Sequence, residues 1–478
     1  MAGISRIASP NMYALDDTIA AIATPIGEGG IGIVRLSGPQ STSILRRVFS
    51  PGREARAGRD ARLESRRLTY GHVVIPESGE TVDEVLAVFM AAPRTYTRED
   101  VAEIHCHGGV VPLRRTLELV LRSGARLARP GEFTLRAFLN GRIDLAQAEA
   151  VLDVVRARTE ASARIAVGQL EGRMSEPIRQ ARSALLHCLA SLEATLDSPD
   201  EDVNASSQGA SGSLNLPDAL HQTAHLLGDL LSQADQGLVY RQGVRAVIVG
   251  RPNVGKSSLL NALLRYDRAI VTPLPGTTRD TVEETIHLSG VPFCLVDTAG
   301  IAESHNPIDQ LGIERSRSAL INADLVLFVV DGSEPLTAED RALDEELRNR
   351  SVLVVVNKAD LLQLADCANI VPDAVHVSVS ALTGSGLTDL EQAMTDAVLA
   401  GQVLVSDRPV VSNPRHKEAL SRALARLSAA IEGLSSGVPV DMLASDLRQA
   451  AGALGEITGE SVDEDLLSTI FGDFCIGK

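Results

Sequence analysis

Residues 250–257 read GRPNVGKS, and this stretch decides the fold of the middle of the chain. An apolar run, 246–249, precedes it, and LLNAL at 259–263 follows as the start of a helix. A glycine-rich loop between a strand and a helix is typical of a P-loop, whose backbone N–H groups surround a phosphate, although a glycine-rich turn that happens to contain Lys-Ser is the alternative. We expect the lysine to reach the β- and γ-phosphate oxygens and the following serine to bind magnesium. The candidate residues are Asn253, Val254, Gly255, Lys256, Ser257 and Ser258.

Four shorter motifs follow this loop in a fixed order. GTTRD at 276–280 is placed like a switch loop that brings a threonine hydroxyl to magnesium, and DTAG at 297–300 would put a carboxylate beside the metal and an amide near the γ-phosphate. The aspartate of NKAD at 357–360 can accept two hydrogen bonds from guanine that adenine cannot supply, and SAL at 380–382 can complete the base pocket. Since α/β sheets bind ligands at the carboxyl ends of their strands, the five motifs together predict a GTP-binding domain.

The later motifs add a second set of candidate residues. Thr278 is expected to bind magnesium together with the P-loop serine, and Thr278 and Lys256 are candidate catalytic residues. The further candidate GTP-binding residues are Thr272, Pro273, Leu274, Pro275, Gly276, Thr277, Thr278, Asp297, Thr298, Ala299, Gly300, Asn357, Lys358, Asp360, Ser380, Ala381 and Leu382.

Apolar runs alternate with helical segments between residues 244 and 399, which is typical of a mostly parallel α/β sheet. Helices rich in Ala, Leu and Glu are expected before this block and again after residue 412, with Pro177 as the main interruption and a polar loop at 197–215. The simplest explanation is one helical domain with another domain inserted into it. The strands expected in the block are 246–249, 293–296, 325–330, 352–356 and 375–379.

The first part of the chain, residues 17–130, mixes β-rich runs such as 32–36 and 85–89 with a helix-like stretch at 111–122. We therefore expect an N-terminal α+β domain, an all-α helical domain and an inserted α/β P-loop domain of the Ras-like type. The expected limits are 1–140 for the first domain, 141–242 and 402–478 for the two helical halves, and 243–401 for the inserted domain.

Composition excludes several classes of protein. The 478-residue chain has a formal charge of −17, which argues against a nonspecific nucleic-acid binder, because such proteins need a clustered basic surface. The five scattered cysteines contain no CxxC pair, so we expect neither a disulfide framework nor a zinc site. We see no signal-peptide pattern and no apolar stretch of roughly 18 residues, and expect a cytoplasmic protein without a membrane span. Lysine is rare beside arginine, and two of the four lysines, Lys256 and Lys358, fall inside nucleotide motifs.

The flanks of the predicted GTP-binding domain carry further motifs: DTIAAIATP at 17–25, GGIGIVRLSG at 29–38, HGG at 107–109, RPGEFT at 129–134, DLAQAE at 144–149 and FCIGK at 474–478. Together they resemble the tRNA-modifying GTPase family called MnmE or TrmE over essentially the whole chain. The resemblance implies a homodimer whose N-terminal domain binds a one-carbon tetrahydrofolate derivative. It also implies an FAD-containing partner, MnmG (GidA), with which the family forms a heterotetramer. The pair adds a carboxymethylaminomethyl or aminomethyl group to carbon 5 of the wobble uridine of certain tRNAs.

VTPLPGT at 271–277 resembles the potassium-binding loop of this family, in which a cation offsets developing phosphate charge. An ordinary switch loop is the alternative. Ile301 stands where Ras-like proteins place a glutamine, so hydrolysis must orient its water with another residue. The family carries a glutamate shortly after DTAG, and alignment through LGIER at 311–315 puts Asp309 there as a candidate catalytic residue. By resemblance, the potassium ligands are Asn253, Thr272, Leu274 and Thr277.

By match to the family's motifs, Arg35, Glu103, Arg142 and Lys478 would hold the folate. Arginine and lysine can pair with its glutamate tail or formyl oxygen, and a carboxylate can accept two N–H bonds from a pterin ring. Cys475 is either a reactive thiol that acts in tRNA modification or a buried structural cysteine.

Two alternatives remain at the end of the sequence argument. His105 and His107 could suggest a metal site, but no third ligand is evident, so we favour packing and hydrogen bonding. The runner-up function is a GTP-switched assembly factor, for example in ribosome maturation, which would need neither the folate motifs nor the CIGK end.

Overall fold

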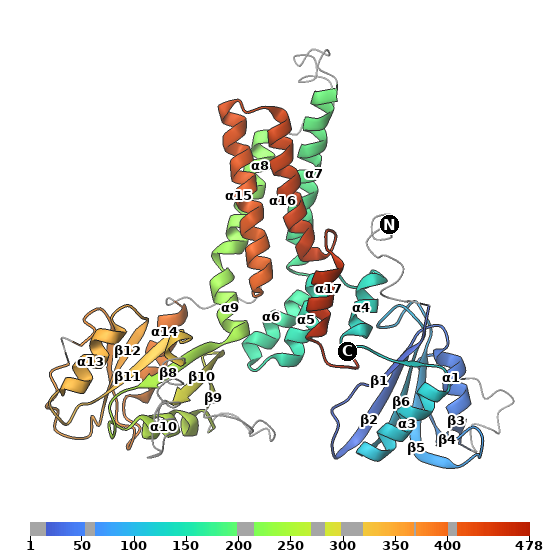
Figure 1. The fold of residues 1–478 in the computed structure, drawn as a ribbon, viewed down its shortest axis with the longest axis horizontal. Helices are drawn as coiled ribbons and strands as arrows, with labels where there is room; N and C mark the ends of the chain where they lie inside the picture. The colour runs from blue at the N-terminus through green and yellow to red at the C-terminus, as the bar shows by residue number, and fades with distance from the viewer. Residues whose placement is uncertain are drawn as a thin grey trace. The chain divides into compact units, whose positions relative to one another are not determined.

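The structure is a computed structural model that describes residues 16–52, 63–197, 215–268, 283–297, 319–367, 370–399 and 409–478 (Figure 1). Its packing divides the chain into two units. The first comprises residues 1–152, 170–223 and 422–478, and the second comprises 153–169 and 224–421. The second unit therefore contains three short helical stretches, at 153–169, 224–242 and 414–421, together with the α/β block. The domain limits expected from the sequence remain predictions.

The N-terminal part of the first unit is a seven-stranded sheet with the order β3-β4-β5-β6-β2-β1-β7. All neighbours are antiparallel except β1 and β7, which are parallel. Helices α1 and α3 pack against one face of it, which confirms the predicted α+β class. The strands are β1 (Ile19–Ile22), β2 (Gly29–Ser37), β3 (Phe49–Pro51), β4 (Thr69–Val74), β5 (Thr81–Met90), β6 (Val101–Gly108) and β7 (Arg126–Leu127), and the helices are α1 (Ser41–Val48), α3 (Val110–Arg122) and α4 (Glu132–Leu139).

Side chains alternate along β2 and β6, so one set of residues faces the core of this domain and the other set lies on the opposite face of the sheet, called here the functional face. Val34 and Ile104 are fully buried in the core that also contains Leu113 of α3. Because successive side chains of a strand point to opposite faces, Arg35 and Glu103 lie on the face away from that core.

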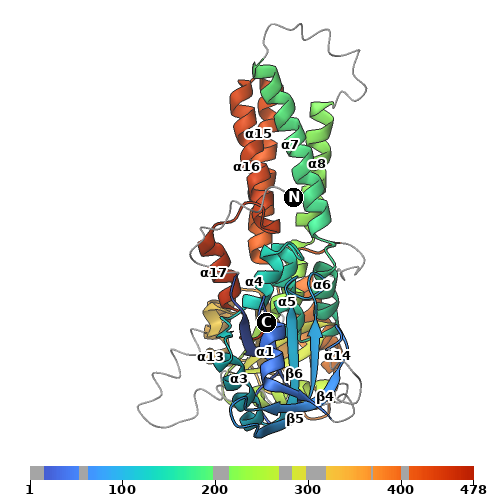
Figure 2. The same cartoon turned by 90° about the vertical axis from the view of Figure 1, so that its right-hand side faces the viewer.

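Helices before and after the α/β block pack on each other, as expected for an interrupted helical domain. Helix α7 lies beside α16 (Figure 2), and Arg182 Nε donates to the Ala451 carbonyl at 3.3 Å. The Arg422 guanidinium of α15 pairs with Glu456 of α16 at 2.6 Å. These helices are α5 (Leu145–Arg156), α6 (Glu160–Leu170), α7 (Ser175–Asp197), α8 (Leu216–Ser232), α9 (Ala234–Gln242), α15 (Pro414–Ser436), α16 (Val440–Thr458) and α17 (Glu464–Gly472).

The prediction that Pro177 interrupts the helices after residue 145 is wrong. Pro177 is the third residue of α7, where a missing backbone N–H costs nothing because the first turn has no intrahelical partner for it. The breaks fall instead between α5 and α6 and between α6 and α7. At the first break Thr159 and Ser162 cap the start of α6 with reciprocal side-chain bonds, and at the second Gly172 has a φ of 86°.

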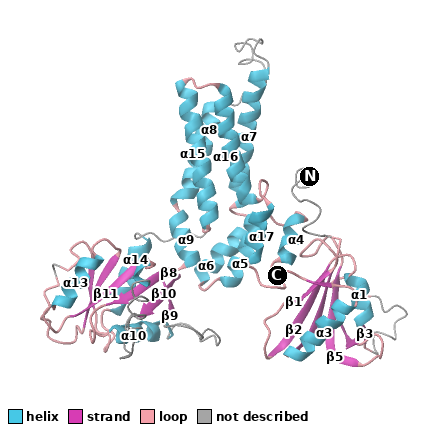
Figure 3. Ribbon diagram, in the orientation of Figure 1, coloured by secondary structure: helices cyan, strands magenta, loops and turns pink. Residues whose placement is uncertain are grey.

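The second unit contains a six-stranded sheet with the order β13-β12-β11-β8-β10-β9. Figure 3 shows strands of this sheet in magenta, with α10, α13 and α14 in cyan. The strands of the sheet are parallel except for the β9–β10 pair, so the predicted mostly parallel sheet is confirmed. Helices α10 and α14 cover one face and α13 the other. The elements are β8 (Val244–Val249), α10 (Lys256–Arg268), β9 (Glu283–Leu288), β10 (Val291–Asp297), β11 (Leu325–Asp331), α13 (Ala338–Leu347), β12 (Val352–Asn357), β13 (Val375–Ser378) and α14 (Leu387–Leu399).

Each of the five strands expected in this block overlaps an observed strand, and the sequence missed the antiparallel edge strand β9. The predicted loop at 197–215 falls almost entirely outside the described residues. Among the residues that are described, no helix is both long and apolar enough to cross a bilayer.

Candidate functional site

The P-loop joins the end of β8 to the start of α10, and its backbone needs glycine at both ends. Gly250 has a φ of 154° and Gly255 a φ of 98°. A Cβ at Gly255 would lie 2.3 Å from Asn357 Nδ2, so no side chain fits there. Asn253 also has a positive φ, 66°, in the left-handed region that asparagine tolerates better than most residues.

Two predicted site residues, Lys256 and Ser257, begin α10. The Lys256 side chain is 7% exposed, and its Nζ donates to the carbonyls of Gly250 and Arg251 at 2.9 Å each, so it folds back over the loop. Ser257 Oγ donates to Asp297 Oδ2 at 2.8 Å. A hydroxyl and a carboxylate oxygen are hard ligands of the kind magnesium prefers, and they meet at the N-terminus of a helix, which favours anions.

The predicted base-recognition residues are connected to the P-loop through Asn357. Its Nδ2 donates to the Val254 carbonyl at 2.8 Å, and its Oδ1 accepts from the Ala381 backbone N–H at 3.1 Å. Ser380 Oγ donates to Asp360 Oδ1 at 2.6 Å, which holds one oxygen of the carboxylate predicted to read guanine. The second oxygen remains available for a base.

A cavity of about 830 Å³ lies between α10 and these loops. Asn261 and Arg265, which the sequence argument did not select, also line it, and their spacing of three and four residues from Ser258 and Asn261 places them on one side of α10. Helical spacing after the P-loop is the signal that could have found them. The predicted residues in the lining are Gly255, Ser258, Asn357, Lys358, Asp360, Ala381 and Leu382.

Asp331, another residue that the motifs did not reveal, holds Lys358. It is the last residue of β11, its side chain is 2% exposed, and its carboxylate pairs with Lys358 Nζ and accepts from Ser333 Oγ at 2.6 Å. Burial acts to raise the pKa of Asp331, but the hydrogen bonds from Lys358 and Ser333 outweigh it and hold this pKa below its usual value. The carboxylate therefore stays ionised at neutral pH. A carboxylate directly after a buried apolar strand was the available signal.

Eleven of the predicted site residues lie outside the described residues, so the structure places none of them. The expected potassium loop, one of the two magnesium ligands and the candidate catalytic aspartate are among them. They are Thr272, Pro273, Leu274, Pro275, Gly276, Thr277, Thr278, Thr298, Ala299, Gly300 and Asp309.

A second cluster of predicted residues lies on the functional face of the N-terminal sheet. Arg35 and Glu103 are cross-strand partners of β2 and β6, and Arg35 Nε contacts Glu103 Oε1 at 2.8 Å. Arg35 Nη1 donates to the Gly477 carbonyl at 3.4 Å, which brings the C-terminal tail to the same place. Gly477 has a φ of 99° and passes so close to β1 that a Cβ would lie 2.3 Å from the Ile22 carbonyl oxygen.

The tail adds a second cation to this cluster. Partial burial and the positive charge of Arg35 lower the pKa of Lys478 below its usual value. The two like charges would both be stabilised by an anionic group between them.

Cys475 is exposed, so the structure decides against the buried structural cysteine that the sequence left open.

Arg142 lies over the ring of Tyr96, with 4.7 Å from its guanidinium carbon to the ring centroid, and its Nη1 donates to the Tyr96 carbonyl at 3.1 Å. The Tyr96 hydroxyl is within 2.9 Å of Thr134 Oγ1. Burial raises the pKa of Tyr96, and the Thr134 hydrogen bond and the charges of Arg142 and Arg35 act against that rise. Cations, a carboxylate and aromatic faces are a set that fits a ligand with a pterin ring and carboxylates.

The two histidines of β6 make separate hydrogen bonds. His105 Nε2 lies 3.2 Å from Glu103 Oε2, and His107 Nδ1 lies 2.7 Å from Asp83 Oδ1. Within the ranges that the structure describes, no three His, Cys, Asp or Glu side chains gather in a way that could hold a metal ion.

Two models of one protein family together match most of this chain. Residues 18–142 match the family model of the GTP-binding protein TrmE N-terminus, and residues 145–475 match that of the MnmE helical domain. The tRNA modification GTPase MnmE of Chloroflexus aurantiacus is 52% identical over 97% of this chain and 100% of its own length. That of Roseiflexus castenholzii is 49% identical over 97% of this chain and 99% of its own. This chain belongs to the MnmE family. It is a GTPase of tRNA modification.

Among solved structures, Era of Aquifex aeolicus is similar to this MnmE family member at 28% identity, over 38% of this chain and 66% of that chain, with a TM-score of 0.27.

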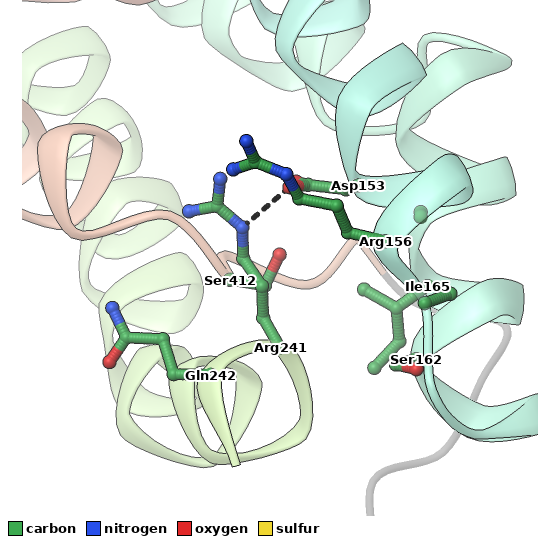
Figure 4. Close-up of a pocket in the computed structure, with 9 residues that line it drawn as sticks. Asp153, Arg156, Ser162, Ile165, Arg241, Gln242 and Ser412 are labelled. Atoms are coloured by element: carbon green, nitrogen blue, oxygen red, sulfur yellow. Dashed lines mark hydrogen bonds and ion pairs between the residues drawn. The ribbon is translucent and has the colours of Figure 1, made fainter. Parts of the chain in front are cut away.

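A further cavity of the second unit, about 280 Å³, lies at the end of α9, one residue before β8 begins (Figure 4). Arg241 Nε contacts Asp153 Oδ1 there at 2.8 Å and joins α9 to α5. This ion pair holds the helix that leads into the first strand of the GTP-binding domain.

Proposed function

We propose that this chain hydrolyses GTP with potassium stimulation through dimerisation of its G domains. With an FAD-containing MnmG partner in a heterotetramer, the homodimer adds a carboxymethylaminomethyl or aminomethyl group to carbon 5 of the wobble uridine of certain tRNAs. The observation that carries the proposal is the contact of Arg35 with both Glu103 and the Gly477 carbonyl. It supports a ligand site made jointly by the N-terminal sheet and the CIGK tail, which a GTP-switched assembly factor would not need.

The residues of the P-loop would perform the GTP chemistry by positioning and charge stabilisation. The backbone N–H groups of residues 253–257 and the N-terminus of α10 would bind the β-phosphate, and Lys256 would leave its loop carbonyls for the β- and γ-phosphate oxygens. Ser257 and Thr278 would bind magnesium, with Asp297 beside it. Magnesium and potassium supply positive charge where negative charge develops during phosphoryl transfer.

We propose that Asp309 orients the attacking water, since Ile301 cannot. Asp309→Ala is then expected to slow single-turnover GTP hydrolysis without raising the dissociation constant of a non-hydrolysable GTP analogue. Equal hydrolysis rates in variant and parent would rule this role out.

The N-terminal cluster would bind a one-carbon tetrahydrofolate. Arg35, Arg142 and Lys478 would meet its anionic or carbonyl oxygens, and Glu103 would accept N–H bonds from the pterin. Titration calorimetry of the full-length chain with 5-formyltetrahydrofolate tests this site directly, and an absence of binding heat at millimolar ligand would exclude it.

The first experiment for the GTPase measures turnover in potassium and in sodium buffer at equal ionic strength, with the oligomeric state recorded alongside. Faster turnover in potassium, with nucleotide-dependent association of G domains, is expected. Equal rates in both salts would remove the cation mechanism. Deletion in the source organism, followed by nucleoside profiling of tRNA, separates the two functions: loss of the modified uridine is expected, and a normal profile would favour an assembly factor.

A further inference from the structure

His105 lies beside the proposed folate site and belongs to none of the motifs that predicted it. Its Nε2 is 3.2 Å from Glu103 Oε2, while Arg35 Nε is 2.8 Å from Glu103 Oε1. The carboxylate of Glu103 is therefore held at both oxygens, by two side chains from adjacent strands.

The register of β2 and β6 explains why Arg35, Glu103 and His105 come together. Glu103 and His105 are two residues apart on β6, so they share one face, and Arg35 and Ile33 are their cross-strand partners on β2. The side chains of Arg35, Glu103 and His105 are 25%, 16% and 20% exposed. They lie on the face opposite the core of Val34, Ile104 and Cys106, and so they are not needed to fill that core.

A carboxylate offers about four acceptor directions, two on each oxygen. Arg35 and His105 use one on each, so each oxygen can still accept an N–H group of a ligand. A contact at one oxygen alone would let the carboxylate rotate, and the ligand would then bear the cost of stopping that rotation on binding.

We propose that His105 is a positioning residue that fixes the plane of the Glu103 carboxylate, so that both oxygens face the N–H edge of a pterin-type ring. The inference rests on the proposed folate site and goes beyond it, because it assigns the recognition of that N–H edge to a pair, Glu103 and His105. The contact needs an N–H donor on residue 105 rather than a positive charge, so a neutral side chain with an amide N–H can replace the imidazole.

The test compares three full-length variants by titration calorimetry with 5-formyltetrahydrofolate. His105→Leu removes the donor and is expected to weaken binding about tenfold, which is the upper range for the loss of one ordered side chain. His105→Gln keeps an N–H donor and is expected to bind within about twofold of the parent. His107→Leu, on the same strand and bonded to Asp83 instead, is the matched control and is expected to leave affinity unchanged.

A second ligand separates positioning from a general loss of structure. A 2-desamino analogue of the same folate lacks the 2-amino group and with it one of the two N–H contacts that the carboxylate would accept, so the parent should bind it more weakly than the full ligand. In His105→Leu that difference between the two ligands should shrink, because the carboxylate is no longer aligned to detect it. An equal affinity of parent and His105→Leu for the full ligand, or an undiminished difference between ligands, would overturn the proposal. If the parent itself binds no folate, the proposed folate site fails instead.

Discussion

The nucleotide site and the N-terminal site are built in opposite ways. In the first, most of the groups that would meet GTP come from short motifs of consecutive residues, and many are backbone groups whose position the loop itself determines. In the second, Arg35 and Glu103 are 68 residues apart in the sequence, and Arg35 and Gly477 are 442 apart. A site of local motifs can be recognised from sequence spacing alone, whereas a site assembled by strand register and a returning tail cannot.

The largest expected effect is a loss of GTP turnover that leaves folate binding unchanged. Lys256→Ala should lower GTP turnover about 1,000-fold, because it removes the ammonium group that would stabilise charge on the transferring phosphate. The same variant should bind 5-formyltetrahydrofolate as the parent does. Turnover assays and calorimetry on one preparation measure both, and a joint loss would mean that the two sites are coupled.

Arg35→Ala should damage the N-terminal site alone. The variant leaves Glu103 without its arginine partner and releases the Gly477 carbonyl, so folate affinity should fall about 30-fold, as for the loss of a hydrogen-bonded charge. GTP turnover should be unchanged. Arg67→Ala, which removes an exposed arginine paired with Glu64 in the same domain, is the control and should alter neither quantity.

Asp331→Asn tests whether the nucleotide site depends on anything beyond its motifs. Without the carboxylate, Lys358 loses its ion-pair partner, and the dissociation constant for GDP should rise about tenfold. Fluorescent nucleotide titration measures this effect. Asp396→Asn, which changes an exposed aspartate of α14, should leave it unaltered. Unchanged affinity in Asp331→Asn would show that the motif alone positions Lys358.

The smallest expected effect concerns the support of Arg142. Tyr96→Leu removes the ring under the guanidinium, and folate affinity should fall about threefold, the size of an exposed cation–π contact. Tyr96→Phe keeps the ring and loses only the hydroxyl contact with Thr134, so it should bind nearly as the parent does. Equal losses in both variants would assign the effect to the hydroxyl.

Strand positions in the α/β block were largely predictable, because buried parallel strands are continuous apolar runs. The expected strand 325–330 appears as Leu325–Asp331, for example, and 352–356 as Val352–Asn357. The edge strand β9 reads EETIHL and was missed, because an edge strand need not be apolar throughout. Pro177 misled the helix prediction, because proline breaks a helix in its interior but is tolerated in its first turn, and sequence alone did not show where α7 begins.

The N-terminal site shows more clearly which residues of a site sequence patterns can predict and which they cannot. A family resemblance pointed to Arg35, Glu103, Arg142 and Lys478. The two-residue spacing of Glu103 and His105 could have placed His105 on the same face of a strand, but the contact of Arg142 with Tyr96 joins two loops that no spacing rule brings together. The position of Asp331 at the end of a buried apolar run could be read from the sequence, whereas its pairing with Lys358 depends on the alignment of β11 with β12.

The sequence by itself determined the motifs of the GTP-binding domain, because glycines with a positive φ in the P-loop and a lysine at the start of the following helix are set by local geometry. Tertiary structure alone decided that Arg35 meets Glu103 and the C-terminal tail, and that Arg142 lies over the ring of Tyr96. The physical reason is the range of the interactions involved. Backbone conformation is set within a few residues, whereas side-chain contacts across a sheet depend on register, which the whole buried face of that sheet selects.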